Sequence, residues 1–195
     1  MSPVESGVLE AMFLHRTFEA ALSWEAYLAT DPDRATRWRE FHEKVELVEP
    51  QRSLLAGFTR RLNVLCISGI WCGDCVQQGP MLERIAAASP EIDLRWVDRD
   101  EHAELAAQVK INAGLRVPVV LFMAEDFELL GWYGDRTLAR YRALAAKNLG
   151  PSCPVPGAPV PPDELAATLA DWVNEFERFQ LMLRLSPRLR HRHGD

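Results

Sequence analysis

Hydrophobic positions in residues 1–60 recur with a helical period. Apolar side chains return every three or four residues in three stretches, and Asp31, Asp33 and Pro50 are suitable start signals for the second and third stretches. Members of these stripes are Phe18, Leu22, Trp24, Tyr27, Leu28, Trp38, Phe41, Val45, Leu54, Leu55 and Phe58. We therefore expect residues 1–60 to form a helical N-terminal extension whose aromatic stripes pack against a core.

The pattern changes at Leu62, where a nearly continuous apolar run predicts a buried β-strand. From this point strand and helix signals alternate along the chain. The expected elements are a strand over 62–69, a helix over 73–89, a strand over 92–97, a helix over 101–111, strands over 118–123 and 128–133, and a helix over 135–149. The order β-α-β-α-β-β-α predicts an α/β domain over residues 61–150, in which two parallel strands joined by a crossover are followed by a hairpin.

The last part of the chain contains a linker, a helix and a basic tail. Residues 151–162 are rich in proline and predict an extended, semi-rigid linker. Residues 163–195 begin with a helix whose apolar stripe runs from Leu165 to Leu183, and we expect it to dock back onto the domain. The arginine-rich residues 184–195 are expected to be solvated and mobile.

Composition and charge exclude several classes of protein. Hydrophobic residues make up 48% of the chain and charged residues 26%, as in a globular domain with a substantial core. The net charge of −6 does not favour binding to nucleic acid, which requires a basic face. The longest apolar run, residues 117–124, is too short to span a bilayer, so no membrane association is expected. No secretory signal stands at the start of the sequence, which favours a cytoplasmic location.

The segment Trp71-Cys72-Gly73-Asp74-Cys75 is the strongest candidate for chemistry. It follows the first expected strand and opens a helix, where unpaired backbone N–H groups and the helix dipole favour a negative charge on Cys72. Cys75, one turn later, is placed to attack a mixed disulfide formed at Cys72. Gly73 leaves room for a substrate backbone, and Trp71 would shield one side of the sulfur pair.

Together with three further features, this segment resembles the thioredoxin superfamily. Pro80 follows Cys75 at the position where that family kinks its active-site helix, and Val117-Pro118 begins the third strand. The resemblance, over about residues 61–145, implies a thioredoxin-like fold with a mixed four-stranded sheet. It also implies a cis peptide bond at Pro118 facing the cysteine pair, with Val117 offering its backbone to substrate, and a substrate groove completed by Gly134.

The sequence departs from that family's pattern at two positions. The family usually carries a buried aspartate at the position of Cys66, and a buried thiol cannot replace a carboxylate base at neutral pH. Cys66 is interpreted as a small strand hydrophobe, with a third redox thiol as the alternative. Asp74 places a negative charge near Cys72, which predicts a higher Cys72 pKa than an apolar residue would give. Arg116 is expected at the groove edge, as a surface residue or as a partner for Asp74 or an acidic substrate.

Metal binding is the main alternative chemistry for a Cys-x-x-Cys motif. Structural zinc requires four ligands, and Cys66, Cys153 and the histidines do not supply a second pair at suitable spacing. Neither a metal nor a bound cofactor is therefore expected. Cys153 is interpreted as an incidental linker cysteine, with an intermolecular disulfide as the alternative.

The sequence predicts a thiol–disulfide oxidoreductase that reduces protein disulfides through Cys72 and Cys75. The resemblance implies that electrons come from a thioredoxin reductase or a small-molecule thiol. The alternative is a partner-binding or redox-sensing module of the same fold without turnover, which the large helical additions and the missing buried acid favour.

Overall fold

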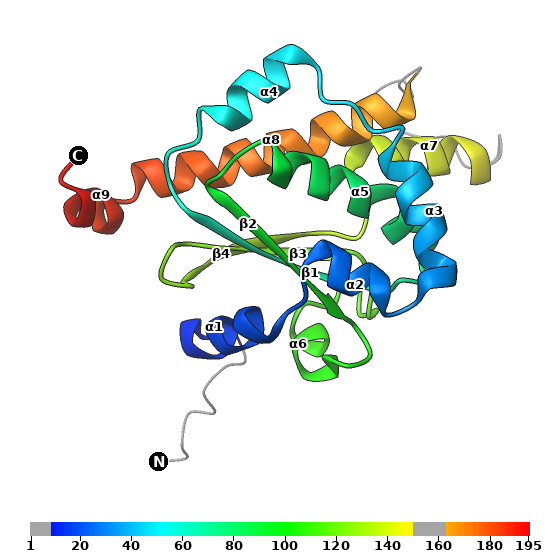
Figure 1. Ribbon diagram of the computed structural model, residues 1–195, viewed down its shortest axis with the longest axis horizontal. Helices are drawn as coiled ribbons and strands as arrows, with labels where there is room; N and C mark the ends of the chain where they lie inside the picture. The colour runs from blue at the N-terminus through cyan, green and yellow to red at the C-terminus, as the bar shows by residue number, and fades with distance from the viewer. Residues whose placement is uncertain (1–8, 150–162) are drawn as a thin grey trace.

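A computed structural model describes residues 9–149 and 163–195 of the chain (Figure 1). The helices are α1 (Ala11–Ala20), α2 (Trp24–Ala29), α3 (Pro32–His42), α4 (Glu49–Ala56), α5 (Gly73–Ala87), α6 (Ala103–Gln108), α7 (Leu138–Asn148), α8 (Glu164–Leu185) and α9 (Pro187–His193). The strands are β1 (Leu62–Ser68), β2 (Ile92–Asp98), β3 (Val119–Met123) and β4 (Leu129–Gly134). The helical N-terminal segment expected from the apolar stripes is thus four helices, α1 to α4, over the residues described.

The four strands form one mixed sheet in the order β2-β1-β3-β4. β1 pairs parallel with β2 and antiparallel with β3, and β3 pairs antiparallel with β4. Every residue of β1 and β3 is buried, because these two central strands are covered on both faces, and this explains their continuous apolar sequences. The predicted α/β fold with its β-α-β-α-β-β-α order is confirmed.

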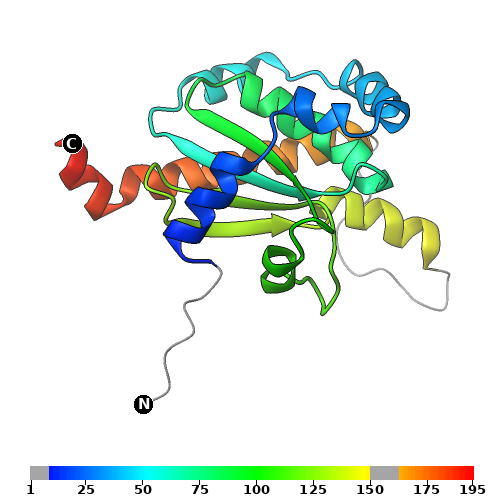
Figure 2. The same cartoon turned by 60° about the horizontal axis from the view of Figure 1, so that its bottom comes forward.

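Helices cover both faces of the sheet. Helices α4, α5 and α8 lie above it in Figure 1, whereas α1 and α6 lie below it and come forward in Figure 2. The segment between α1 and α2 covers the β2 edge, because Leu22 exchanges both backbone hydrogen bonds with Trp96, at 2.9 and 2.8 Å. This bridge leaves the β2 edge less open to pairing with another chain.

Helix α8 docks back onto the domain, as its apolar stripe predicts. Its buried face includes Trp172, Phe176 and Phe179. Phe122 of β3 stacks on Phe179 with ring centroids 4.1 Å apart and meets Phe176 edge-on at 5.1 Å. Aromatic packing of this kind fixes α8 across the sheet and buries apolar surface that would otherwise face water.

Most side chains of the basic tail are exposed to solvent, as expected, but the tail also forms a helix with ion pairs to the domain. Residues 187–193 form helix α9, which buries Leu189. Arg188 forms an ion pair with Asp126, and Arg192 reaches Glu125 at 2.8 Å. These two acidic residues lie between β3 and β4, so the tail packs against a hairpin that is far from it in sequence.

Two expected helices have different bounds in the structure. The helix expected over 101–111 ends earlier, since Ile111 and Gly114 form a β-bridge instead. The helix expected over 135–149 begins only after Thr137, whose side chain accepts a hydrogen bond at the helix N-terminus. The residues before it are thereby left to form the rim of the candidate site described below.

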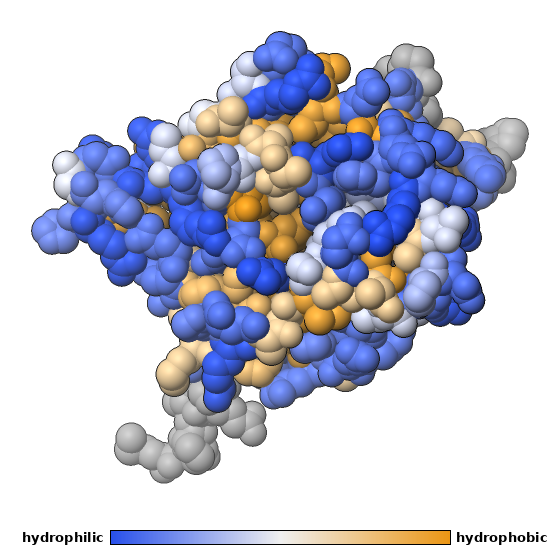
Figure 3. Space-filling view, viewed as in Figure 1, coloured by the Kyte–Doolittle hydropathy of each residue, from blue (hydrophilic) through white to orange (hydrophobic). Residues whose placement is uncertain are grey.

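The proline-rich segment 151–162, expected to be a linker, lies outside the described residues, and so does Cys153. Among the helices of the described part of the chain, none is long and apolar enough to cross a membrane. The face in Figure 3 is mainly hydrophilic, with apolar residues exposed in a hollow near its centre.

Candidate active site

Cys72 lies at the N-terminus of α5, directly after the turn that follows β1. It is the N-cap residue, half-buried, and its backbone carbonyl accepts a hydrogen bond from the N–H of Val76 at 2.9 Å. Its sulfur lies 3.7 Å from the carbonyl oxygen of Val117. Cys75, inside the first turn of the same helix, is fully buried. The two thiols therefore share one helix end but differ in their access to solvent.

The environments of the two thiols shift their pKa values in opposite directions. The pKa of Cys72 is lowered to about 6, chiefly by a hydrogen bond from the Cys75 thiol and further by the backbone N–H groups of Cys75 and Asp74; burial and the Asp74 charge oppose this. The pKa of Cys75 is raised well above its usual value, first by burial and then by Cys72. At neutral pH the first cysteine is thus mainly a thiolate, and the second is a protonated thiol.

The loop facing the cysteines is built by a close contact between two strands. The Val117–Pro118 peptide bond is cis, and Pro118 lies just before β3. Gly134, at the end of β4, lies so close that a Cβ atom there would be 2.3 Å from the Pro118 carbonyl oxygen. Only glycine fits this position without a backbone shift, since its φ of +156° also disfavours a side chain.

Several predicted site residues meet around one shallow pocket of about 180 Å³. Its lining consists of Trp71, Cys72, Asp74, Arg99, Leu115, Arg116, Val117, Asp135 and Arg136. Gly73 is exposed beside it, and a Cβ atom there would have no neighbour within 4 Å, whereas Pro118 and Cys75 are buried. The pocket is therefore a surface depression over the Cys72 sulfur, bordered by three arginines.

Asp74 is neutralised by residues other than Arg116, the partner considered from the sequence. Arg136 contacts one oxygen of Asp74 at 2.6 Å, and Arg140 contacts the other at 3.2 Å. Arg140 also pairs with Glu164 of α8 at 2.6 Å. Because two guanidinium groups bind its carboxylate, Asp74 destabilises the Cys72 thiolate less than an unpaired acid would.

Arg99 is a site residue that the sequence did not indicate. It follows β2, and its guanidinium lies 4.7 Å from the centroid of the Trp71 ring. Trp71 is 45% exposed, so this cation–π contact holds a large apolar ring at the pocket rim. The residues are distant in sequence, and no local pattern signals their contact.

The N-terminal helices contact the turn before Cys72 directly. The buried indole N–H of Trp38, in α3, donates to the carbonyl oxygen of Ile70 at 3.0 Å. Gly79 in α5 allows this approach, because a Cβ there would lie 2.1 Å from the Trp38 ring. The extension therefore packs against both the turn before Cys72 and the helix after it.

Helix α8 supports the opposite side of the site. The indole N–H of Trp172 donates to the side-chain oxygen of Gln78 at 3.0 Å, and the Gln78 amide donates to the Asp135 carbonyl at 3.0 Å. All three residues are buried. This chain of hydrogen bonds links α8 through α5 to the residue that follows Gly134.

Cys66 is fully buried in β1, and burial raises the pKa of its thiol. Its environment agrees with the interpretation as a small core residue. No group of three or more potential metal ligands occurs within residues 9–149 and 163–195.

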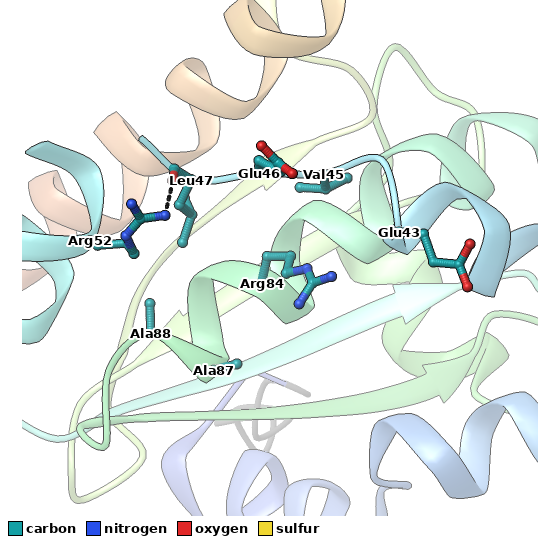
Figure 4. Close-up of a pocket in the computed structure, with 8 residues that line it drawn as sticks. All are labelled: Glu43, Val45, Glu46, Leu47, Arg52, Arg84, Ala87 and Ala88. Carbon is teal, nitrogen blue, oxygen red and sulfur yellow. Dashed lines mark hydrogen bonds between the residues drawn. The ribbon is translucent and has the colours of Figure 1, made fainter. Parts of the chain in front are cut away.

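A second pocket, of about 540 Å³, lies away from the cysteines (Figure 4). It is lined by Glu43, Val45, Glu46, Leu47, Arg52, Arg84, Ala87 and Ala88. Ala87 ends α5, whereas Cys72 caps its start, so the 15-residue helix separates the two places by about 22 Å. This pocket does not contribute to the chemistry of the cysteine pair.

Comparison with known proteins gives a family and several relatives. A family model described as Thioredoxin matches residues 21–146, so the similarity begins before α2 and is wider than the span of 61–145 expected from the motifs. Thioredoxin-1 of Saccharomyces cerevisiae is 28% identical over 86 residues, which cover 44% of this chain and 81% of that protein. The mitochondrial thioredoxin of Bos taurus is 31% identical over 81 residues, 41% of this chain and 47% of that protein.

A solved structure shares nearly the whole fold. A protein of unknown function from Pseudomonas aeruginosa superimposes with a TM-score of 0.63 at 20% identity, covering 89% of this chain and 98% of its own. At this identity the likeness concerns the fold alone. It includes helices outside a minimal β-α-β-α-β-β-α core, so those additions are not peculiar to this chain.

Proposed function

The chain belongs to the thioredoxin family, and from that premise we propose that it is a thiol–disulfide oxidoreductase that reduces protein disulfides through Cys72 and Cys75. One observation carries the proposal. A half-exposed cysteine with a pKa of about 6 stands one helical turn from a buried, protonated cysteine. This is the arrangement that an attacking and a resolving thiol require.

The proposed reaction consists of two thiol–disulfide exchanges. The Cys72 thiolate attacks one sulfur of the substrate disulfide, a mixed disulfide forms, and the other substrate sulfur leaves as a thiolate. Cys75 then attacks the Cys72 sulfur, so that the Cys72–Cys75 disulfide forms and the second substrate sulfur leaves, taking up the proton that Cys75 gives up. The substrate gains two electrons and the protein loses two.

Substrate binding is assigned to the residues around the shallow pocket. Trp71 and Gly73 would contact the chain that carries the disulfide, and the backbone at Val117 would pair with it beside Pro118 and Gly134. Arg99 and Arg116 add positive charge at this rim. We therefore expect disulfides flanked by acidic residues to be preferred over those flanked by basic residues.

The cycle needs an electron donor but no bound cofactor. We propose that a thioredoxin reductase or a small-molecule thiol reduces the Cys72–Cys75 disulfide, and that the protein transfers electrons in the cytoplasm. Partners are then proteins with accessible disulfides.

Variants of the two cysteines test the proposal against a binding module without turnover. Reduction of a disulfide-bonded protein such as insulin, with dithiothreitol as donor, is expected to be lost in Cys72→Ser. Cys75→Ser is expected to accumulate a mixed disulfide at Cys72, detected by mass spectrometry. Cys153→Ser is the matched control and should retain turnover. If the wild-type protein binds partners but never reduces a disulfide, the alternative is correct.

A further inference from the structure

Two buried hydroxyl groups next to Cys75 have no role in the reaction as described so far. They belong to Tyr27 in α2 and to Ser68 at the end of β1, and both side chains are almost completely buried. Neither oxygen has a partner within ordinary hydrogen-bonding geometry among the described residues. A buried hydroxyl without a partner is unfavourable, so such a pair beside a reactive thiol requires an explanation.

The sheet places these groups on one face. Cys66 and Ser68 are two residues apart in β1 and therefore point to the same side. Across the parallel pair, Trp96 lies beside Cys66 and Asp98 beside Ser68. The Tyr27 ring stacks on Trp96, with centroids 5.6 Å apart and an interplanar angle of 19°. Aromatic packing thus fixes the Tyr27 ring against β2, beside the last residues of β1.

The surroundings of Cys75 disfavour its thiolate, so a hydroxyl group that donates a hydrogen bond to the sulfur would stabilise it. Burial and the neighbouring sulfurs of Cys72 and Cys66 raise the pKa of Cys75, while the Ser68 hydroxyl lowers it. Burial also keeps the pKa of Tyr27 above its usual value, with a smaller contribution from Asp98, so this phenol stays neutral and able to donate. The Ser68 hydroxyl lowers the pKa of Tyr27 as well as that of Cys75.

We propose that Tyr27 and Ser68 act in series on the resolving cysteine: the Tyr27 hydroxyl donates to Ser68, and the Ser68 hydroxyl donates to the Cys75 sulfur as it becomes a thiolate. The proposal rests on the proposed function of the Cys72–Cys75 pair. During resolution Cys75 loses its proton, its sulfur bonds to Cys72, the bond from Cys72 to the substrate sulfur breaks, and that sulfur leaves and is protonated. Tyr27 and Ser68 start and end this step neutral.

This assignment gives the N-terminal extension a part in the chemistry. Position 66, next to Cys75, holds a thiol that burial keeps protonated, so it supplies no charge. Stabilisation of the Cys75 thiolate then comes from hydroxyl dipoles, one of them from a helix that precedes the first strand. In the proposed step Ser68 donates to the reacting sulfur, and Tyr27 is a positioning residue that acts through it.

Single-turnover kinetics of Ser68→Ala and Tyr27→Phe test the proposal. Reduced protein is mixed with a peptide disulfide, quenched with acid at intervals, and analysed by mass spectrometry for the mixed disulfide at Cys72. We expect resolution to slow by about tenfold or more in Ser68→Ala, by less in Tyr27→Phe, and its pH profile to move to higher pH in both. The first attack by Cys72 should change little.

The matched control is Ser89→Ala. Ser89 also has a buried hydroxyl without a partner among the described residues, but it follows the C-terminal end of α5, far from Cys75. Its variant should resolve at the wild-type rate. Wild-type resolution rates and pH profiles in both Ser68→Ala and Tyr27→Phe would overturn the proposal while leaving the proposed function intact. Failure of the wild-type protein to form any mixed disulfide would instead overturn the proposed function.

Discussion

The two cysteines of the motif are neighbours at one helix end, and the contrast between their surroundings supports the different roles proposed for them. Cys72 faces a shallow pocket with arginines at its rim, and helix N–H groups and the Cys75 thiol stabilise its thiolate. Cys75 faces the core, where burial keeps it protonated. Two cysteines with only Gly73 and Asp74 between them therefore differ in state at neutral pH: Cys72 is mainly a thiolate and Cys75 a buried, protonated thiol.

The acidity of each thiol depends on neighbours from distant parts of the chain. On the Cys72 side, Asp74 is neutralised by residues of α7 and its preceding turn. On the Cys75 side, the neighbouring hydroxyl comes from β1, and α2 places a second one beside it.

Alkylation rates measure the difference between Cys72 and Cys75 directly in the wild-type protein. Since the pKa of Cys72 is about 6, its thiolate forms above that pH, and its reactivity with iodoacetamide should fall as the pH drops through 6. Cys75, buried and protonated, should react at least about a thousandfold more slowly at pH 7. Peptide mapping after alkylation at a series of pH values checks both. A midpoint near 8.5 for Cys72 would contradict the low pKa.

Removal of the Trp38 side chain should weaken the packing that buries Cys75. Trp38→Ala deletes a fully buried ring and the hydrogen bond to Ile70, and we expect a loss of about 3–5 kcal/mol in the free energy of unfolding. Cys75 should become more accessible to alkylation. Trp132→Ala is the control, because Trp132 is 42% exposed, and its cost should stay within about 1 kcal/mol. Equal losses in urea unfolding of the two variants would contradict the proposed support by α3.

Gly134→Ala should disturb the loop that faces Cys72. The added methyl group would meet the Pro118 carbonyl, and a backbone shift costing about 1–3 kcal/mol is expected. Gly73→Ala is the matched change on the helix side, where nothing stands in the way, and its unfolding free energy should stay within about 0.5 kcal/mol of wild type. If thermal or urea unfolding ranks the two variants in the reverse order, the close contact at Pro118 does not determine the stability cost of a side chain at position 134.

Asp74→Asn should have the smallest effect of these changes, a lower pKa of Cys72. Loss of the carboxylate removes a charge that opposes the Cys72 thiolate and leaves Arg136 and Arg140 without this partner, so the pKa of Cys72 should fall below its wild-type value. Thiolate absorbance at about 240 nm during a pH titration follows the change. Glu40→Gln, an exposed change on α3, is the control. An unchanged or higher pKa in Asp74→Asn would contradict the electrostatic argument.

The pattern of apolar residues along the sequence predicted the fold, because the burial of each strand or helix determines that pattern. The continuous apolar runs of β1 and β3 and the helical stripe of α8 follow from how strongly each element is buried. The motif also predicted which end of which helix holds Cys72 and Cys75. The ion pairs of the tail were not predicted, because the acids that pair with Arg188 and Arg192 lie between β3 and β4, which no local pattern connects with the tail.

The electrostatic surroundings of the site could not be predicted in the same way. Arg136 and Arg140 have the spacing of an ordinary charged helix face, and only the fold brings them to Asp74. Tyr27 looks like any aromatic core residue in a helical stripe, and Ser68 like the end of a strand. Their position beside Cys75 is a tertiary property that requires α2, β1 and α5 together.

A redox titration in defined thiol–disulfide buffers tests the Cys72–Cys75 couple most directly, with each cysteine followed by mass spectrometry. We expect a single two-electron transition between Cys72 and Cys75, toward the potential of about −270 mV typical of thioredoxins, with Cys66 remaining a thiol. A potential near or above about −200 mV would contradict a reducing role. If no Cys72–Cys75 disulfide forms at any poise, the pair is not a redox couple and the chain acts as a binding module.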